Sequence, residues 1–394
     1  MVYIRAKQLP GLHKYKYSGV DHSLVSLYVL KPFYTHVAIK CFPLNMAPNA
    51  ITLSGFGFVV LNFLTMLYYN PTLDQDMPSW VYASWAVGLF LYQTFDAVDG
   101  TQARRTHQSG PLGELFDHSV DALNTVLEVL LFAAAMNLAT LTFYIQTWDE
   151  YYTKTLTLGI VSGPVEGILT LCIVYAITAV KGGASFWQQS MLQTFGVPEH
   201  SLIPEYFYKL PFNEWYMVYG GIVLVLNTLQ SIYNVLSLRQ SQKKSFADPL
   251  TGLIPFFVTW IFVPAYLYLQ PVILDYHLIP FVFYVGLINA YSVGQIIIAH
   301  LTQSEFPHQN YLLSVPLAVG VVDSLGGALG LWPGVLGDGT YQIGYMFALL
   351  GLGVGVYGSF VYDIITTICD YLDIWCLTIK HPWDYEKEEY KKAN

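Results

Sequence analysis

Long apolar stretches, separated by short polar segments, recur along most of the 394-residue chain. An apolar helix of about 20 residues crosses the roughly 30 Å hydrocarbon core of a bilayer. The pattern predicts an all-α fold, a polytopic integral membrane helical bundle with about ten transmembrane helices. The predicted spans cover residues 52–69, 79–103, 115–138, 139–156, 164–181, 213–238, 250–270, 277–301, 311–332 and 341–376.

A shorter amphipathic segment precedes the first span, between Asp21 and Pro43. Its apolar helical face carries Phe33, Tyr34, Val37, Ala38 and Cys41. This face predicts an N-terminal interfacial amphipathic helix that lies on the membrane surface. Because Ile39 and Phe42 interrupt the opposite, polar face, a helix packed at the periphery of the bundle is the alternative.

The composition agrees with a membrane protein. Apolar residues make up 54% of the chain and charged residues only 11%, whereas soluble domains carry about 25% charged residues. The net charge is −9 and no basic stripe is present, so we expect no nucleic-acid partner. The four cysteines are scattered among apolar residues without a CxxC pair, which favours packing roles over disulfides or zinc binding.

The positions of the basic residues predict the orientation of the spans. Lysine and arginine accumulate in loops on the cytosolic side of membrane proteins. If the N-terminus is cytosolic and the spans alternate, all 18 lysines and arginines except Lys181 and Lys209 fall on the cytosolic side. We therefore expect both termini, and the loop between the second and third spans, to face the cytosol.

Four aspartates gather around this loop, in the segment FDAVDGTQARRTHQSGPLGELFDHSVDAL at residues 95–123. Asp96 and Asp99 lie three residues apart near the end of the second span, and Asp117 and Asp121 lie four apart near the start of the third. Each spacing places a pair on one helical face. A short loop that joins the two helices allows the pairs to face each other.

Four facing carboxylates need a cation, because their mutual repulsion is otherwise uncompensated. Oxygen ligands favour hard ions such as Mg²⁺ or Mn²⁺, and two ions would support an in-line phosphoryl-type transfer. Helix capping is the alternative for Asp117, but it does not explain Asp96 and Asp99, which lie near a helix C-terminus where the dipole opposes negative charge.

The residues between the aspartates fit a phosphate ligand. Gly100, Ala103 and Gly113 leave room for a ligand to approach the two helices. The guanidinium of Arg104 is suited to bind a phosphate with two hydrogen bonds. Arg105 points to another side of the helix, where lipid headgroups or a topological role are expected.

The pattern D-x2-D-G-x2-A-R-x8-G-x3-D-x3-D resembles the signature of the CDP-alcohol phosphotransferases. All eight fixed positions are met: Asp96, Asp99, Gly100, Ala103, Arg104, Gly113, Asp117 and Asp121. The resemblance extends to MAPNAITLSG at 46–55, GPLGELFDH at 110–118, GPVEGI at 163–168 and the terminal TIKHP. These stretches resemble the eukaryotic choline- and ethanolaminephosphotransferases, especially the fungal ones.

This resemblance implies a reaction and a set of roles. CDP-choline or CDP-ethanolamine and diacylglycerol would give phosphatidylcholine or phosphatidylethanolamine and CMP. Asp96, Asp99 and Asp117 would bind metal, and Asp121 would complete the shell of a second ion. Asn49 and Arg104 would contact the CDP-alcohol.

The resemblance leaves open which residue removes the proton of the acceptor hydroxyl. His118 is one candidate, because a histidine titrates near neutral pH and this one directly follows Asp117. The eukaryotic members suggest Glu166 as its carboxylate partner. Asp121 is the rival, since it is the presumed base in relatives that lack the histidine.

The resemblance also suggests where the protein acts and how it is organised. We expect a cytosolic N-terminus at 1–45, a catalytic bundle at 46–238, a transmembrane scaffold at 239–380 and a cytosolic tail at 381–394. The expected location is the endoplasmic reticulum or Golgi membrane, and a homodimer is left open.

Two other activities fit part of the pattern. A transferase that uses a different acceptor, such as inositol or glycerol phosphate, would need more basic residues than spans two to five offer. A cation-coupled transporter would place its carboxylates near the bilayer midplane, and these lie near one face. The sequence does not distinguish choline from ethanolamine.

Overall fold

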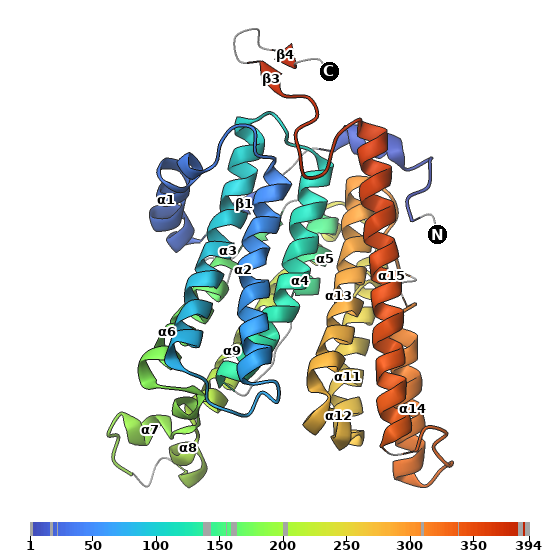
Figure 1. Ribbon diagram of the computed structural model, residues 1–394. Coiled ribbons are helices and arrows are strands. Elements are labelled where there is room, and N and C mark those ends of the chain that lie inside the picture. The colour runs from blue at the N-terminus through green and yellow to red at the C-terminus, as the bar shows by residue number, and fades with distance from the viewer. Residues whose placement is uncertain are drawn as a thin grey trace.

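A computed structural model describes the fold. It covers residues 3–15, 19–21, 23–136, 143–154, 156–158, 164–199, 204–308, 311–337, 339–384 and 389–390. Long helices run side by side in these regions and form one bundle (Figure 1). The described part of the chain is therefore all-α apart from two small strand pairs, as the hydrophobic pattern predicts.

The bounds of the elements follow the apolar stretches closely. In the N-terminal half they are η1 Leu9–Lys14, β1 Gly19–Asp21, η2 Ser26–Leu30, α1 Lys31–His36, η3 Ala38–Cys41, α2 Pro48–Tyr69, α3 Ser79–Arg105, α4 Pro111–Met136, α5 Phe143–Thr153, β2 Leu156–Leu158 and α6 Pro164–Lys181. After these come η4 Ala184–Gln188, α7 Met191–Thr194, α8 Glu205–Lys209, α9 Phe212–Ser241, α10 Ala247–Thr251, α11 Ile254–Leu269, α12 Pro271–Tyr276, α13 Leu278–Leu301, α14 Ser314–Leu329, α15 Thr340–Leu372, β3 Trp383–Asp384 and β4 Glu389–Tyr390. Strands β1 and β2 pair in parallel, with Gly19 opposite Leu156, and β3 and β4 pair antiparallel.

Six helical segments in the described part are long and apolar enough to cross a membrane: α2, α4, α9, the α10–α11 segment, α13 and α15. The α3 helix has 27 residues but is more polar, and α14 has 16. The α5 helix has 11 residues, or about 16 Å at 1.5 Å per residue, too short to cross a bilayer alone. The predicted fourth span, 139–156, lies partly outside the described residues, and the count of ten spans stays a prediction.

The segment before α2 forms three short helical pieces where one amphipathic helix was expected. They are η2, α1 and η3, and they pack against α2 and α3. The buried side chains are Leu30, Tyr34, Ala38, Ile39 and Phe42, whereas Val37 and Cys41 of the predicted apolar face are exposed. The backbone changes helical type between the pieces, which rotates the buried face away from the one that a single helix would present.

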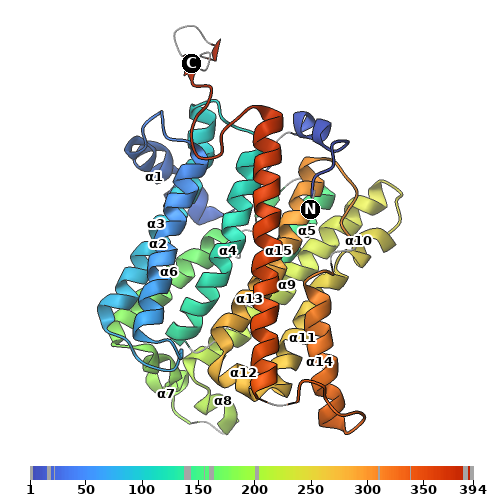
Figure 2. The same cartoon turned by 45° about the vertical axis from the view of Figure 1, so that its right-hand side comes forward.

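The α4 helix is the centre of the bundle. Its residues contribute both to the apolar core shared with α2, α3 and α6 and to the core built on α13 and α15. A close helix–helix approach joins it to the second core, because a Cβ atom at Gly286 of α13 would lie 2.2 Å from Cγ2 of Val126. The α15 helix runs along the full height of the bundle beside α13 (Figure 2).

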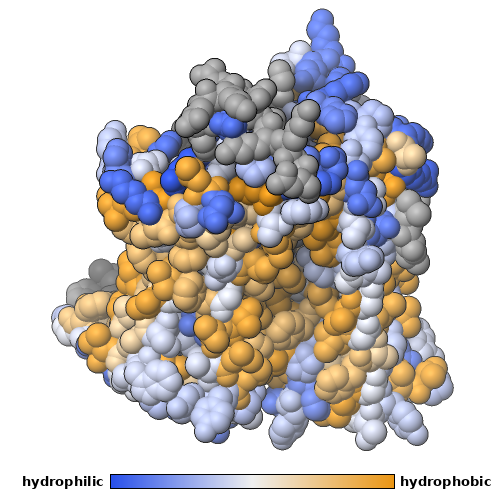
Figure 3. All heavy atoms as spheres, turned by 45° about the horizontal axis from the view of Figure 1, so that its top comes forward, coloured by the Kyte–Doolittle hydropathy of each residue, from blue (hydrophilic) through white to orange (hydrophobic). Residues whose placement is uncertain are grey.

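Hydrophilic residues gather at one end of the bundle. The N-terminal helices, the loop between α3 and α4 and the segment that follows α15 all lie at this end (Figure 1). On the face shown in Figure 3, apolar side chains cover the region beneath the hydrophilic end. This distribution is typical of an integral membrane protein, whose apolar belt contacts lipid.

We predict that the α4–α13 contact is essential for stability. G286V would force its side chain into Val126, and overpacking of this kind costs about 1–3 kcal/mol. The matched control is G351V on α15, where nothing lies within 4 Å of an added Cβ atom. Thermal unfolding of the detergent-solubilised protein should show a lower midpoint for G286V and an unchanged one for G351V. Equal unfolding midpoints for G286V and G351V would contradict a close contact between α4 and α13 at Gly286.

Candidate active site

Two helices bring three of the four motif aspartates together. Asp96 and Asp99 lie near the C-terminal end of α3, and Asp117 lies two turns into α4. One carboxylate oxygen from each of the three lies within 4.8 Å of the others. The short 106–110 loop makes this possible, because it reverses the chain at the hydrophilic end and sets α4 beside α3.

Two hydroxyl groups hold Asp99 and Asp121. Thr52 of α2 donates a hydrogen bond to Oδ2 of Asp99. Tyr92 of α3, which is fully buried, donates one to Oδ1 of Asp121. Asp121 is therefore paired with Tyr92 and is not among the three clustered ligands, although the motif places it one turn after Asp117.

The two inner aspartates each keep an oxygen without a partner. Oδ1 of Asp96 and Oδ1 of Asp117 are buried, and neither accepts a hydrogen bond within the described part of the chain. A buried carboxylate oxygen without a donor is costly, and a cation satisfies it. The donor set, which consists only of oxygen atoms, fits a hard divalent ion such as Mg²⁺ or Mn²⁺.

The residues that the resemblance assigns to the CDP-alcohol lie on the same helices as the aspartates or at the start of α2. Asn49, at the start of α2, is buried, and its Oδ1 would lie 4.0 Å from a Cβ atom at Gly113. Nη2 of Arg104 donates to Thr101 at 3.1 Å, and Nη1 would lie 3.7 Å from a Cβ atom at Gly100. Arg104 and Gly100 thus lie next to each other on α3, while Ala103, one residue before Arg104, is half-buried.

The last turn of α3 also anchors the segment before α2. Gln102 is fully buried, and its Nε2 donates to the carbonyls of Pro43 at 2.8 Å and Met46 at 3.0 Å. Nη1 of Arg105 donates to the carbonyls of Ile39 and Phe42, each at 3.1 Å. Arg105 therefore binds protein backbone, a contact that the sequence does not predict, and its topological role stays a prediction. Partners that lie more than 50 residues away leave no signal in a local pattern.

His118 lies beside the aspartates and has contacts on both ring nitrogens. Nδ1 lies 2.9 Å from the carbonyl oxygen of Glu114 and 4.0 Å from Oδ2 of Asp117, and Nε2 lies 3.6 Å from Oε2 of Glu150. A carbonyl oxygen only accepts hydrogen bonds, so Nδ1 carries a proton. In neutral His118, Nε2 is then the basic nitrogen.

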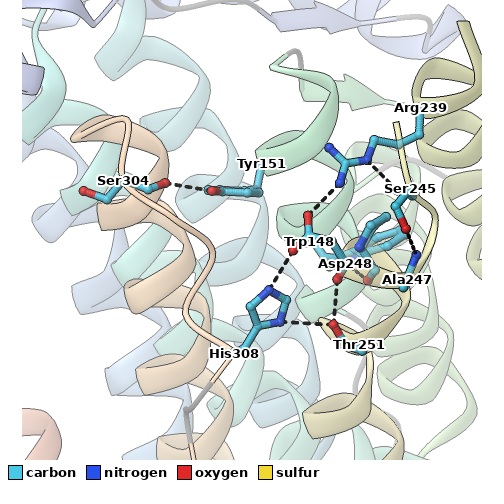
Figure 4. Close-up of polar contacts among 10 residues, drawn as sticks. Trp148, Tyr151, Arg239, Ser245, Ala247, Asp248, Thr251, Ser304 and His308 are labelled. Atoms are coloured by element: carbon cyan, nitrogen blue, oxygen red, sulfur yellow. Dashed lines mark hydrogen bonds and ion pairs between the residues drawn. The ribbon is translucent and has the colours of Figure 1, made fainter. Parts of the chain in front are cut away.

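Glu150 is held in place by the neighbouring side chains of α5. Nε1 of Trp148 donates to the carbonyl of Pro249 at 3.0 Å, and the hydroxyl of Tyr151 donates to the carbonyl of Ser304 at 2.7 Å. Figure 4 shows these contacts around α5. Both residues flank Glu150 in the sequence, so the bonds fix the turn of α5 that carries its carboxylate.

An ion-pair network reinforces this anchor. Asp248 accepts hydrogen bonds from Nη2 of Arg239 at 2.7 Å and pairs with Nε2 of His308 at 2.9 Å, and Thr251 lies beside the same imidazole (Figure 4). These residues come from α9, α10 and the segment after α13. The second half of the chain thereby supports a helix that faces the candidate site.

The resemblance implies that Glu166 is the carboxylate partner of His118. The hydrogen bond described for Glu166 is with another residue. Its Oε1 accepts a hydrogen bond from Ser23, and its Oε2 is buried without a hydrogen bond in the described part of the chain. Among the described contacts of His118, the carboxylate beside Nε2 is that of Glu150. The sequence offers one signal for Glu150, because it is an acidic residue within the apolar stretch of the predicted fourth span.

A second group of ionisable side chains borders His118. One ligand atom from each of Glu114, Glu150 and His300 lies within 4.8 Å of the others. Nε2 of His300 lies 4.0 Å from Oε1 of Glu114, and Tyr15 donates a hydrogen bond to Oε2 of the same carboxylate. His300 of α13 is therefore part of the surroundings of His118.

Comparisons with known proteins agree with the motif. A family model described as CDP-alcohol phosphatidyltransferase matches residues 45–237. A protein of the CDP-alcohol phosphatidyltransferase class-I family from Schizosaccharomyces pombe is 43% identical over 95% of this chain and 97% of its own length. Choline/ethanolaminephosphotransferase 1 of Saccharomyces cerevisiae is 39% identical over 96% and 98%, and cholinephosphotransferase 1 of the same yeast is 36% identical over 96% and 98%.

We predict that the aspartate cluster binds a divalent ion in the absence of any substrate. D117N should raise the dissociation constant for Mn²⁺ by roughly tenfold or more, because the loss even of an outer-shell partner costs 10–100-fold. The control is D370N on α15, where the aspartate is exposed and outside the cluster. Electron paramagnetic resonance of free Mn²⁺ measures both. Unchanged Mn²⁺ binding by D117N would exclude Asp117 as a ligand.

Proposed function

Because this chain belongs to the CDP-alcohol phosphatidyltransferase family, we propose that it transfers phosphocholine or phosphoethanolamine from the CDP-alcohol to diacylglycerol. The products are phosphatidylcholine or phosphatidylethanolamine and CMP. The observation that carries the proposal is the approach of Asp96, Asp99 and Asp117 to within 4.8 Å, with two of their oxygens buried and without a hydrogen bond from any described residue. The yeast relatives named as choline- and ethanolaminephosphotransferases favour the amino alcohols.

The reaction is a displacement at the β-phosphorus of the CDP-alcohol. The acceptor hydroxyl oxygen of diacylglycerol forms a bond to this phosphorus, and the bond to the bridging oxygen breaks, so that CMP leaves with the electron pair. Two Mg²⁺ or Mn²⁺ ions, when bound, would neutralise the diphosphate and the developing charge. Asp96, Asp99 and Asp117 would hold them, and Asp121 would complete the shell of the second ion.

We assign proton removal from the acceptor hydroxyl to His118. Its Nδ1–H is bonded to the carbonyl of Glu114, which leaves Nε2 as the base. Glu150, 3.6 Å from Nε2, would stabilise the imidazolium that forms. Asp121 is the weaker candidate, because Tyr92 already donates to its carboxylate. Glu166 keeps the role implied by the family as a second carboxylate, with its Oε2 free to interact with the acceptor or the imidazolium.

The CDP-alcohol would bind along α2, α3 and α4. Arg104 would contact a phosphate, Asn49 would contact the nucleotide end, and Gly100, Ala103 and Gly113 would leave room for the ligand. Diacylglycerol would enter from the bilayer, which demands a site open to both phases. The absence of further arginines beside Arg104 and Arg105 in the predicted spans two to five disfavours an acceptor that carries its own phosphate.

We further propose an endoplasmic reticulum or Golgi membrane protein with about ten spans. Both termini and the active site would face the cytosol, where the CDP-alcohols are soluble. The hydrophilic end of the bundle, which holds the first residues of the described chain, the segment after α15 and the α3–α4 loop, supports this orientation. The catalytic bundle would be residues 46–238 and the scaffold 239–380.

The reaction can be tested directly. We expect the detergent-purified protein, given diacylglycerol and Mg²⁺ or Mn²⁺, to release CMP from CDP-choline, from CDP-ethanolamine or from both. Mass spectrometry of the lipid product would identify the acceptor. If neither donor yields CMP while the protein binds Mn²⁺, the proposed activity is wrong.

The proton-transfer roles predict a graded loss of activity. H118A should lower kcat by about 10²–10⁴-fold, the usual contribution of a general base. E150Q should lower kcat by a smaller factor, because the glutamine keeps the shape but loses the charge beside Nε2. Mn²⁺ binding by both variants should match the wild type. If H118A were fully active, His118 would not be the general base and Asp121 would take its place as the candidate. If E150Q were fully active, the contact between Glu150 and His118 would have no part in proton transfer.

A further inference from the structure

The chain that follows α15 crosses the hydrophilic end of the bundle as an irregular segment, Ile374–Trp383, which we call the C-terminal strap (Figure 1). Asp373 begins it in a left-handed conformation, with φ of 54°. Lys380 and His381 bind back to the Asp373 carboxylate, which lowers the pKa of that carboxyl group. These contacts bring Lys380 and His381 of the strap back beside the end of α15.

The strap contacts the start of α2 at a residue of the candidate site. Nδ2 of Asn49 donates to the carbonyl of Cys376 at 3.0 Å. Two residues further along, Thr378 forms an antiparallel bridge with Met46, just before α2. An asparagine side chain has one NH₂ and one carbonyl group, so a strap contact at Nδ2 fixes the direction of Oδ1. That oxygen points toward Gly113 of α4.

The strap also contacts the loop between the two aspartate helices. Nε2 of Gln108 donates to the carbonyl of His381 at 3.2 Å. The rings of His107 and Trp383 stack, with centroids 4.2 Å apart and an interplanar angle of 21°. One end of the strap therefore holds Asn49, and the other end holds the loop that sets α4 beside α3.

We infer that the C-terminal strap positions Asn49 for the CDP-alcohol: the Cys376 carbonyl holds Nδ2, so that Oδ1 accepts a hydrogen bond from an amino or hydroxyl group of the nucleotide end. The Trp383–His107 stack fixes the strap to the α3–α4 loop. The strap is a fixed part of the site, and it stays in place during turnover. This inference rests on the proposed transfer from a CDP-alcohol.

The first test separates positioning from general support. W383A removes the stack, and we expect it to raise the KM for CDP-choline about tenfold. The KM for diacylglycerol should stay within about twofold of the wild-type value. The unfolding midpoint should stay within about 2 °C of the wild type. W332A is the matched control, since Trp332 is exposed in the segment between α14 and α15. An unchanged KM for CDP-choline, or an equal rise for both substrates, would overturn the inference.

A double-mutant cycle tests whether the strap acts through Asn49. N49A should raise the KM for CDP-choline by itself. The effect of W383A should then disappear in the N49A background, because residues that act as one unit are not additive. Additive effects of the two changes would overturn the assignment of Asn49 as the residue that the strap positions.

A cross-link tests whether the strap stays in place. Antiparallel partners have Cα atoms about 4.5–5.5 Å apart, within the range that disulfides bridge. We expect oxidised M46C/T378C to turn over CDP-choline within twofold of its reduced form, with M46C and T378C as single-variant controls. Inactivation on oxidation, reversed by dithiothreitol, would show that the strap must open and would overturn the inference.

The transfer reaction and the role of the strap can be refuted separately. A wild-type protein that releases no CMP from either CDP-alcohol would refute the transfer reaction itself. A wild-type protein that is active, combined with strap variants that leave the KM for CDP-choline unchanged, would refute only the role of the strap.

Discussion

Four aspartates on two adjoining helices of a membrane bundle impose the main constraint on this structure. Carboxylates repel one another strongly in a medium of low dielectric, and they lose hydration when they are buried. The surrounding structure compensates this repulsion and loss of hydration in two ways. Thr52 and Tyr92 donate hydroxyl hydrogens to Asp99 and Asp121, while Asp96 and Asp117 keep buried oxygens for a cation. The α3–α4 loop, the segment before α2 and the C-terminal strap all meet around this cluster.

The sequence predicts the parts of this arrangement that depend on local spacing. The range 164–181 coincides with α6, and 213–238 lies within α9, because an apolar stretch bounded by polar residues determines a helix over its own length. The aspartate spacing likewise assigns one pair to α3 and one to α4. The boundaries of α5 are less predictable, since Asp149 and Glu150 make it resemble neither a span nor a loop.

Contacts between distant segments carry no such local signal. Glu150 reaches His118 only because Trp148 and Tyr151 fix α5 to the segments after α9 and α13. Arg105 binds the carbonyls of Ile39 and Phe42, and these carbonyls belong to a chain that changes helical type twice before α2. A periodicity argument assumes one regular helix, so it places Val37 and Cys41 on the same apolar face as Tyr34 and Ala38. The packing of the irregular pieces buries Leu30 and Phe42.

The strap has a consequence for the biogenesis of the protein. Asn49 and Cys376 are separated by 327 positions in the chain, and membrane proteins are inserted in order from the N-terminus. The helices that carry the aspartates are made early, whereas the carbonyl that accepts the hydrogen bond of the Asn49 amide is synthesised 327 residues after Asn49. A chain released before Cys376 would therefore contain the whole aspartate motif without the contact that holds the Asn49 side chain.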